Sequence, residues 1–305
     1  MAIFEVIKKS WNEYRIHFKN ISLIMILLAV IPALILGGVI LAVAFNNGLW
    51  NNVVSYMSLE ESKSTNNFNL DLEGQQAELS EKIWDSFRPV ALTALILLVP
   101  YWLVNVFAIL CLFVIASHST RQKFRNILKE SKSRYWKFVG TFVLFFAVFL
   151  LALILSVLII SILSKISIVI GILSILIIFL LIIWVSIKFI LTPYFLVYEK
   201  RKILDSYSAS WKSVRGKWWY IFASVLLFLL IGLIIKILAE LILLIIGIPV
   251  TSLFAFDTLK EILYSPAFIT WTITRQVIEH IISSIVILPL LIFFSKNLYK
   301  EIKNK

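Results

Sequence analysis

The sequence is poor in the residues that build catalytic and metal centres. Its 305 residues include one cysteine, Cys111, and three histidines, His17, His118 and His280. A single cysteine excludes an internal disulfide and a thiolate metal cluster. No nucleotide-binding loop, metal-ligand motif, nucleophile elbow or dinucleotide fingerprint occurs in the chain. We therefore expect a protein that is not an enzyme and that uses no cofactor.

Charged residues are scarce as well. They make up 15% of the chain, whereas 61% of the residues are hydrophobic and the mean hydropathy is +0.96. So little polar surface cannot cover a water-soluble protein of this length. The apolar runs are long and lack the alternation of barrel strands, so they must cross a membrane as helices. The predicted fold class is all-α: a polytopic integral membrane protein with a single transmembrane domain, 1–305.

Six apolar segments are long enough to cross a bilayer, which takes about 20 residues. The predicted spans are 21–45, 89–117, 138–163, 168–197, 219–250 and 277–295, followed by a polar, basic tail. The third and fourth spans should form an antiparallel hairpin because their connection is very short. The fifth is too long for a perpendicular span, so it should tilt or break near Lys236. Pro193 should kink the fourth span near its end.

The first span has one alternative interpretation. Its basic start, apolar run and small residues Ala42 and Ala44 resemble a secretory signal with a cleavage site. The run is longer than the ~7–15 residues of a signal core, which favours a span that is retained.

Two polar connections lie between the spans. We interpret the acidic connection 46–88 as an extracytoplasmic loop whose carboxylates are solvated, because they lack the ordered spacing of a calcium loop. In the connection before the sixth span, Thr258 and Glu261 form a capping box that predicts a short helix.

Cations and anions are divided between the two sides of the predicted topology. The segments on the side of the N-terminus hold 22 of the 29 Lys and Arg residues but only 6 of the 17 Asp and Glu residues. Because positive charge is retained in the cytoplasm, both termini are expected there, in a cytoplasmic membrane. The net charge is +12, but the cations gather in short segments between the apolar runs, as membrane topology predicts. They do not form the basic patch typical of nucleic-acid binding, so no nucleic-acid partner is expected.

A basic segment with an apolar stripe precedes spans 1, 3 and 5. In the first copy the stripe is Ile3, Ile7, Trp11, Tyr14 and Phe18, and in the last it is Ile203, Tyr207, Trp211, Val214 and Trp218. Such segments suit amphipathic helices that lie among cytoplasmic headgroups. A looser third copy precedes span 3, so the chain divides into three parallel, repeat-like units, 1–117, 118–200 and 201–305.

The run at 190–222 carries a family resemblance. Pro193 with Tyr194, the turn 199–202, Ser210 with Trp211, and the run 216–219 resemble a signature of multi-span prokaryotic proteins. That group includes the membrane domain found ahead of some bacterial glycerophosphodiester phosphodiesterases and related envelope proteins. The resemblance implies a prokaryotic membrane domain that works beside lipid or envelope metabolism without chemistry of its own.

The preferred hypothesis is a non-catalytic membrane protein that supports envelope or lipid homeostasis. Its partners would be the lipid bilayer and, in particular, anionic lipids, whose headgroups attract juxtamembrane cations. The predicted headgroup-binding residues are Arg121, Lys123, Arg125, Lys129, Lys132, Arg134, Lys137, Trp211, Arg215, Lys217 and Trp218.

Two further hypotheses rest on ionisable residues in spans 5 and 6. A transporter or permease subunit would use Lys236, Glu240, Glu279 and His280 as a polar path, because charged groups inside a bilayer are costly and therefore commonly functional. Snorkelling of Lys236 to the outer interface is the competing interpretation. A lipid-modifying enzyme with Glu279 and His280 as acid and base is the weakest of the three hypotheses, since no nucleophile accompanies them.

Overall fold

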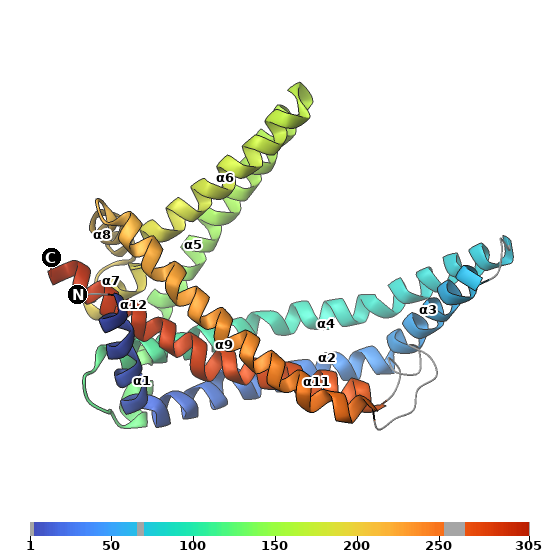
Figure 1. Ribbon diagram of the computed structural model, residues 1–305, viewed down its shortest axis with the longest axis horizontal. Coiled ribbons are helices and arrows are strands. Elements are labelled where there is room, and N and C mark those ends of the chain that lie inside the picture. The colour runs from blue at the N-terminus through green and yellow to red at the C-terminus, as the bar shows by residue number, and fades with distance from the viewer. Residues whose placement is uncertain (1–2, 66–69, 253–265, 305) are drawn as a thin grey trace. The chain divides into compact units, whose positions relative to one another are not determined.

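The computed structural model describes residues 3–65, 70–252 and 266–304, and almost all of them are helical (Figure 1). No strand occurs within these ranges, which confirms the all-α prediction. The predicted helix that begins with the capping box of Thr258 lies outside the described residues.

The described elements are α-helices with two short π-helical segments, η1 and η2. In chain order they are α1 (Ile3–Met25), η1 (Ile26–Val30), α2 (Ile31–Asn46), α3 (Leu49–Thr65), α4 (Leu70–Ser117), α5 (Phe124–Ile166), α6 (Ile168–Phe189), α7 (Thr192–Tyr198), α8 (Ile203–Val214), α9 (Trp218–Ser252), α11 (Pro266–Ile282), η2 (Ser283–Ile287) and α12 (Leu288–Asn304).

Within the described ranges, six helical stretches are long and apolar enough to cross a membrane. They are Ile3–Asn46, Gly74–Ser117, Phe124–Lys165, Val169–Tyr198, Trp218–Gly247 and Trp271–Lys303. The chain is therefore a multi-pass membrane protein, as its composition predicted. The helices α5 and α6 pack side by side as the predicted hairpin (Figure 1).

Two details of the fourth and fifth spans test the predictions made for them. The fourth breaks where proline predicted it, since α6 ends at Phe189 and α7 begins at Thr192 with Pro193 in its first turn. The fifth does not break near Lys236, because α9 is one continuous helix of 35 residues. It contains no proline before Pro249, so nothing in its interior removes a backbone hydrogen bond.

The connection between the first two spans is helical over most of its described length. Here α3 and the start of α4 occupy the predicted loop, of which the sequence predicts only the end to be helical, since Leu79, Ile83 and Phe87 lie at helical spacing. The Asn52 amide donates a hydrogen bond to the Ser86 hydroxyl, 2.8 Å away, which ties α3 to α4. A polar side-chain contact thus contributes to the packing of this helix pair.

The chain forms two compact units. The first contains residues 1–24, 106–233 and 285–305, and the second contains 25–105 and 234–284. In the first unit, α7 packs against α8 and both contact α5. In the second unit, α2 packs against α3, and α11 contacts η1.

The basic segments are joined to their spans in two ways. The helices α1 and α5 run on into the apolar helix without interruption, whereas α8 ends before α9 begins. Gly216 makes that break, because its φ of 80° lies in the left-handed region that residues with a side chain rarely adopt.

The face that α1 buries shares Tyr14 with its Trp-bearing stripe but leaves Trp11 outside. Val6, Ser10, Tyr14 and His17 are buried, whereas Trp11 is 46% exposed. Small and polar side chains allow a close approach to α12, and the large indole ring stays on the outside of the protein, where it can meet lipid.

Three buried serines occupy matching positions in the basic segments. Ser10, Ser131 and Ser210 each lie seven residues beyond the first residue of α1, α5 and α8, and none is more than 2% exposed. The Ser10 hydroxyl accepts a hydrogen bond from the Asn297 amide at 3.0 Å, and the Ser210 hydroxyl donates to the Lys188 carbonyl oxygen at 2.7 Å. The three repeat-like units suggested by the sequence remain a prediction, with this serine as a shared position.

The C-terminal segment, which the sequence shows to be polar and basic, is buried over its first four residues. Lys296, Asn297, Leu298 and Tyr299 are all buried. The physical reason is a set of polar partners in the first unit: the Lys296 ammonium lies 2.8 Å from a Glu13 carboxylate oxygen, and the Asn297 amide donates to the same oxygen at 3.1 Å.

Candidate lipid-binding site

A small basic cavity lies where α5 meets the end of α7. Its volume is about 130 Å³, and its lining brings together four cations from two separate parts of the chain. The lining residues are Ser133, Arg134, Lys137, Phe138, Leu196, Val197, Lys200 and Arg201. Several cations around one small cavity are typical of a site for an anionic group.

Two of the four cations are held in place by protein partners. The Arg134 guanidinium donates to the Val197 carbonyl oxygen at 2.5 Å and to the Glu130 carboxylate at 2.7 Å. The Arg201 guanidinium pairs with Glu199 at 2.6 Å. These contacts neutralise one positive charge each and fix the wall of the cavity.

The other two cations are available to a ligand. Lys137 and Lys200 are exposed, and neither forms an ion pair with any residue that the structure describes. Lys200 also adopts a φ of 55°, an uncommon conformation for a residue with a side chain. The basic cavity therefore carries an uncompensated positive charge.

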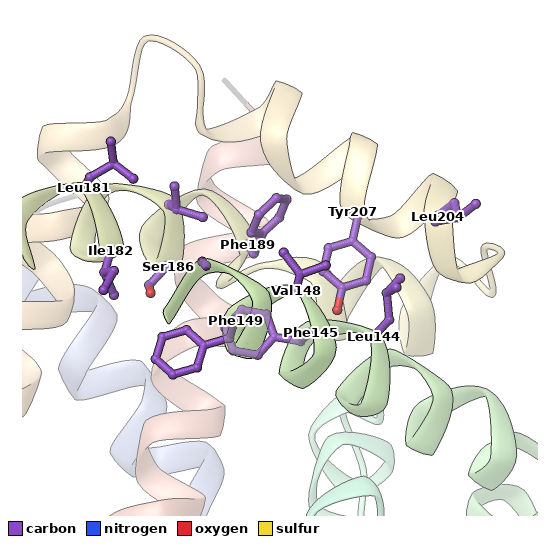
Figure 2. Close-up of a pocket in the computed structure, with 12 residues that line it drawn as sticks. Leu144, Phe145, Val148, Phe149, Leu181, Ile182, Ser186, Phe189, Leu204 and Tyr207 are labelled. Atoms are coloured by element: carbon purple, nitrogen blue, oxygen red, sulfur yellow. The ribbon is translucent and has the colours of Figure 1, made fainter. Parts of the chain in front are cut away.

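An apolar cavity of about 280 Å³ lies further along α5, between α5, α6 and α8 (Figure 2). The helix α5 contributes Leu144, Phe145, Val148, Phe149 and Ala152, and α6 contributes Leu181, Ile182, Val185, Ser186 and Phe189. Leu204 and Tyr207 of α8 complete the lining, so that Ser186 and Tyr207 supply its hydroxyl groups (Figure 2).

Tyr207 separates this cavity from a neighbouring one of about 380 Å³. Its hydroxyl donates a hydrogen bond to the Thr141 carbonyl oxygen at 2.8 Å, and its ring packs edge-on against Phe189 at 5.2 Å. Burial raises the pKa of Tyr207 to about 12, so the hydroxyl keeps its proton at neutral pH. Both cavities are lined by Phe145, Ser186, Phe189 and Tyr207.

The basic cavity and the apolar cavities lie along one face of α5. Arg134 and Lys137 line the first, Thr141 and Phe145 the second, and Val148 the third. Their spacing of three and four residues places them in one helical stripe. A cationic cavity and apolar cavities on one helix face match the two chemical parts of an anionic lipid.

The remaining predicted headgroup residues do not converge on this site. Arg121, Lys123, Arg125, Lys129, Lys132 and Arg215 are exposed. Lys217 and Trp218 are used in packing, since the Lys217 ammonium donates to the Ile302 carbonyl oxygen and the Trp218 indole donates to that of Trp184. Sequence reasoning missed Lys200 and Arg201, which no helical pattern connects to Arg134.

The predicted polar path is partly assembled in the second unit. Arg275 donates hydrogen bonds to Glu240 at 2.9 Å and to Glu279 at 3.2 Å, which joins two of the four residues. Lys236 is exposed, and His280 has a buried ring nitrogen, Nε2, without a partner among the described residues. Sequence reasoning missed Arg275, whose charge offsets that of the carboxylates. The polar path remains a prediction.

A carboxylate beside the basic cavity gives the first unit a pH-dependent contact. Burial acts to raise the pKa of Glu199, but hydrogen bonds from Lys303, Tyr299 and Arg201 outweigh it and lower this pKa to about 2. The Lys303 ammonium lies 2.8 Å from the carboxylate and thereby ties the end of α7 to α12.

Replacing Glu199 by glutamine should lower the free energy of unfolding by about 2 kcal/mol at neutral pH, because hydrogen bonds to a charged acceptor are lost. The pKa of Glu199 in the folded state lies below its ordinary value of 4.5, so the ionised carboxylate stabilises the fold above pH 4.5. This stabilisation is lost as the pH falls toward 2. Thermal unfolding in detergent should therefore show the two proteins converging over this interval. A difference that is the same at every pH would contradict this assignment.

Comparison with known proteins adds no relative. No protein-family model matches the chain, and no match was found among curated proteins or solved structures. Among the described residues, no group of three or more His, Cys, Asp or Glu side chains is placed to hold a metal ion.

Proposed function

We propose that this multi-pass membrane protein is non-catalytic, binds anionic lipid headgroups at the cytoplasmic face and supports envelope or lipid homeostasis. The observation that carries the proposal is the basic cavity, in which Lys137 and Lys200 have no anionic partner among the described residues. The apolar cavities on the same face of α5 support it, because they offer space for acyl chains. The cytoplasmic location follows from the distribution of basic residues.

The resemblance of 190–222 to membrane domains that work beside lipid metabolism agrees with this function. The segment includes Lys200 and Arg201 of the basic cavity as well as Tyr207 of the apolar cavity. Under the proposal, the family signature would therefore surround the site that contacts lipid.

Replacing both Lys137 and Lys200 by glutamine should weaken binding of phosphatidylglycerol about tenfold, since each cation near an anionic surface contributes up to about 1 kcal/mol. The measurement is native mass spectrometry of the full-length protein in detergent, titrated with phosphatidylglycerol or phosphatidylcholine. The loss should concern phosphatidylglycerol alone and should diminish at high salt, because exposed charges are screened.

The matched control replaces Lys165 and Lys236, which are also exposed but lie outside the cytoplasmic basic segments of the predicted topology. This variant loses the same charge and should bind phosphatidylglycerol like the unmodified protein. Equal losses in both variants would show that net charge, rather than the basic cavity, governs binding, and the proposal would then fail.

A further inference from the structure

The first unit also contains a buried cation that lacks a counter-charge, in addition to the exposed lysines of the basic cavity. Lys188, in the last turn of α6, is 6% exposed. Its ammonium nitrogen lies 5.3 Å from the ring centre of Trp184 and 5.2 Å from that of Trp211. No described residue accepts a hydrogen bond from this ammonium or forms an ion pair with it.

The two indole rings compensate only part of the cost of burying this charge. A cation over an aromatic face gains about 2 kcal/mol when it is desolvated, whereas burial of an unpaired ion costs several kcal/mol. The shortfall is the signature of a missing anionic partner.

The surrounding helices fix this arrangement. The Ser210 hydroxyl donates to the carbonyl oxygen of Lys188 at 2.7 Å, and the Trp218 indole donates to the carbonyl oxygen of Trp184 at 3.2 Å. The end of α6 is thereby bound to both α8 and α9. The ammonium and its two rings are held by the fold and do not need a ligand to assemble.

The position of Lys188 along α6 places it at the depth of lipid phosphates. From Ile168 to Lys188 the helix rises about 30 Å at 1.5 Å per residue, which equals the thickness of the hydrocarbon core. When the hairpin tip at Lys165 is at one boundary, Lys188 is therefore at the other. Tryptophan rings are enriched at that depth.

The lining of the apolar cavity does not include Lys188, Trp184 or Trp211, but one ring contact links them to it. The Trp211 ring lies 5.6 Å from the ring of Phe189, which lines both apolar cavities. The Trp211 ring thus contacts both the Lys188 ammonium and Phe189, which lines the apolar space between α5, α6 and α8. A bound molecule that satisfies both parts needs a phosphate and an acyl chain.

We infer that Lys188, between Trp184 and Trp211, binds the phosphate of one anionic phospholipid whose acyl chain occupies the cavity between α5, α6 and α8. The inference deepens the proposed function and rests on it, because the proposed function identifies the phosphate as that of a lipid headgroup. The lipid site at Lys188 differs from the basic cavity in position, because Lys188 does not line that cavity. It also differs in salt dependence, because a buried charge is little screened by salt.

Replacing Lys188 by methionine tests the inference in the full-length protein. In native mass spectrometry, the unmodified protein should keep one bound phosphatidylglycerol at high salt. Lys188→Met should bind this lipid about tenfold more weakly. Lys188→Arg should retain this lipid, and Lys165→Met should behave like the unmodified protein. Unchanged binding in Lys188→Met would overturn the inference.

A second variant separates the acyl chain from the headgroup and does not alter Lys188. Val148→Trp fills the cavity and should weaken binding of long-chain phosphatidylglycerol while leaving a short-chain analogue unaffected. Excess inorganic phosphate should not displace the long-chain lipid. Displacement by phosphate, or equal affinity for both chain lengths, would indicate a site for free phosphate and would contradict the assignment of the cavity.

The two lipid proposals can fail separately. Loss of salt-sensitive binding in the Lys137 and Lys200 double variant, with the salt-resistant lipid retained, would support the basic cavity independently of Lys188. If the double variant binds normally and Lys188→Met loses its lipid, the proposed use of the basic cavity fails and the buried site stands. If neither variant loses lipid, both proposals are overturned.

Discussion

Replacing Glu13 by glutamine is expected to lower the free energy of unfolding by about 3 kcal/mol, because a buried charge loses its counter-ion. The Lys296 ammonium is buried, with 2% of the side chain exposed, and lies 2.8 Å from the Glu13 carboxylate. A glutamine side chain can accept a hydrogen bond there but carries no charge. Thermal unfolding of the purified protein in detergent measures the loss.

A double replacement provides the control. Lys296→Met removes the orphaned charge, and neutral side chains of similar size often substitute for a buried ion pair at little cost. The variant with both Glu13→Gln and Lys296→Met should therefore be more stable than Glu13→Gln alone. Losses that simply add would show that the two groups do not interact, and the ion pair would lose its assigned role.

The second large effect is expected at Gly247, in the second unit. A Cβ atom at this position would lie 2.6 Å from the indole nitrogen of Trp271, far inside van der Waals contact. Because the rigid indole cannot yield as a flexible side chain would, Gly247→Ala should lower the free energy of unfolding by about 1–3 kcal/mol. The same thermal unfolding assay detects it.

Gly232 is a matched control within α9. A Cβ atom there would lie 3.6 Å from a methyl carbon of Ile287, an ordinary contact distance, so Gly232→Ala should have little effect or stabilise the helix. Combining Gly247→Ala with Trp271→Leu should restore most of the lost stability. If the combined variant remains as unstable as Gly247→Ala, the clash with Trp271 is not the cause.

Helical periodicity and hydrophobicity predict the helices of this protein, because helix formation depends mainly on residues that are close together along the chain. The six spans, the hairpin of α5 and α6, and the break before Pro193 are of this kind. The fifth span shows where such reasoning ends, because its length predicts either a tilt or a break near Lys236, and the continuous helix α9 excludes the break. Backbone hydrogen bonds within the helix outweigh the presence of one exposed cation.

The candidate site depends on contacts between distant residues, and these could be predicted only in part. Arg134 and Lys137 were expected among the headgroup residues, but their association with Lys200 requires α7 to pack against α5. Lys296 lies in a tail described only as polar and basic, because the sequence does not reveal that Glu13 reaches it. Pairing across such separations depends on the packed structure rather than on local composition.

The polar contact between α1 and α12 has a consequence for the order of biosynthesis. Glu13 and Lys296 are separated by 283 positions, so the first helix leaves the ribosome long before its partner exists. At usual rates of translation this interval is on the order of tens of seconds. During that time the early helix needs water, lipid headgroups or a chaperone to solvate its carboxylate. The first unit therefore becomes complete only when nearly the whole chain has been inserted.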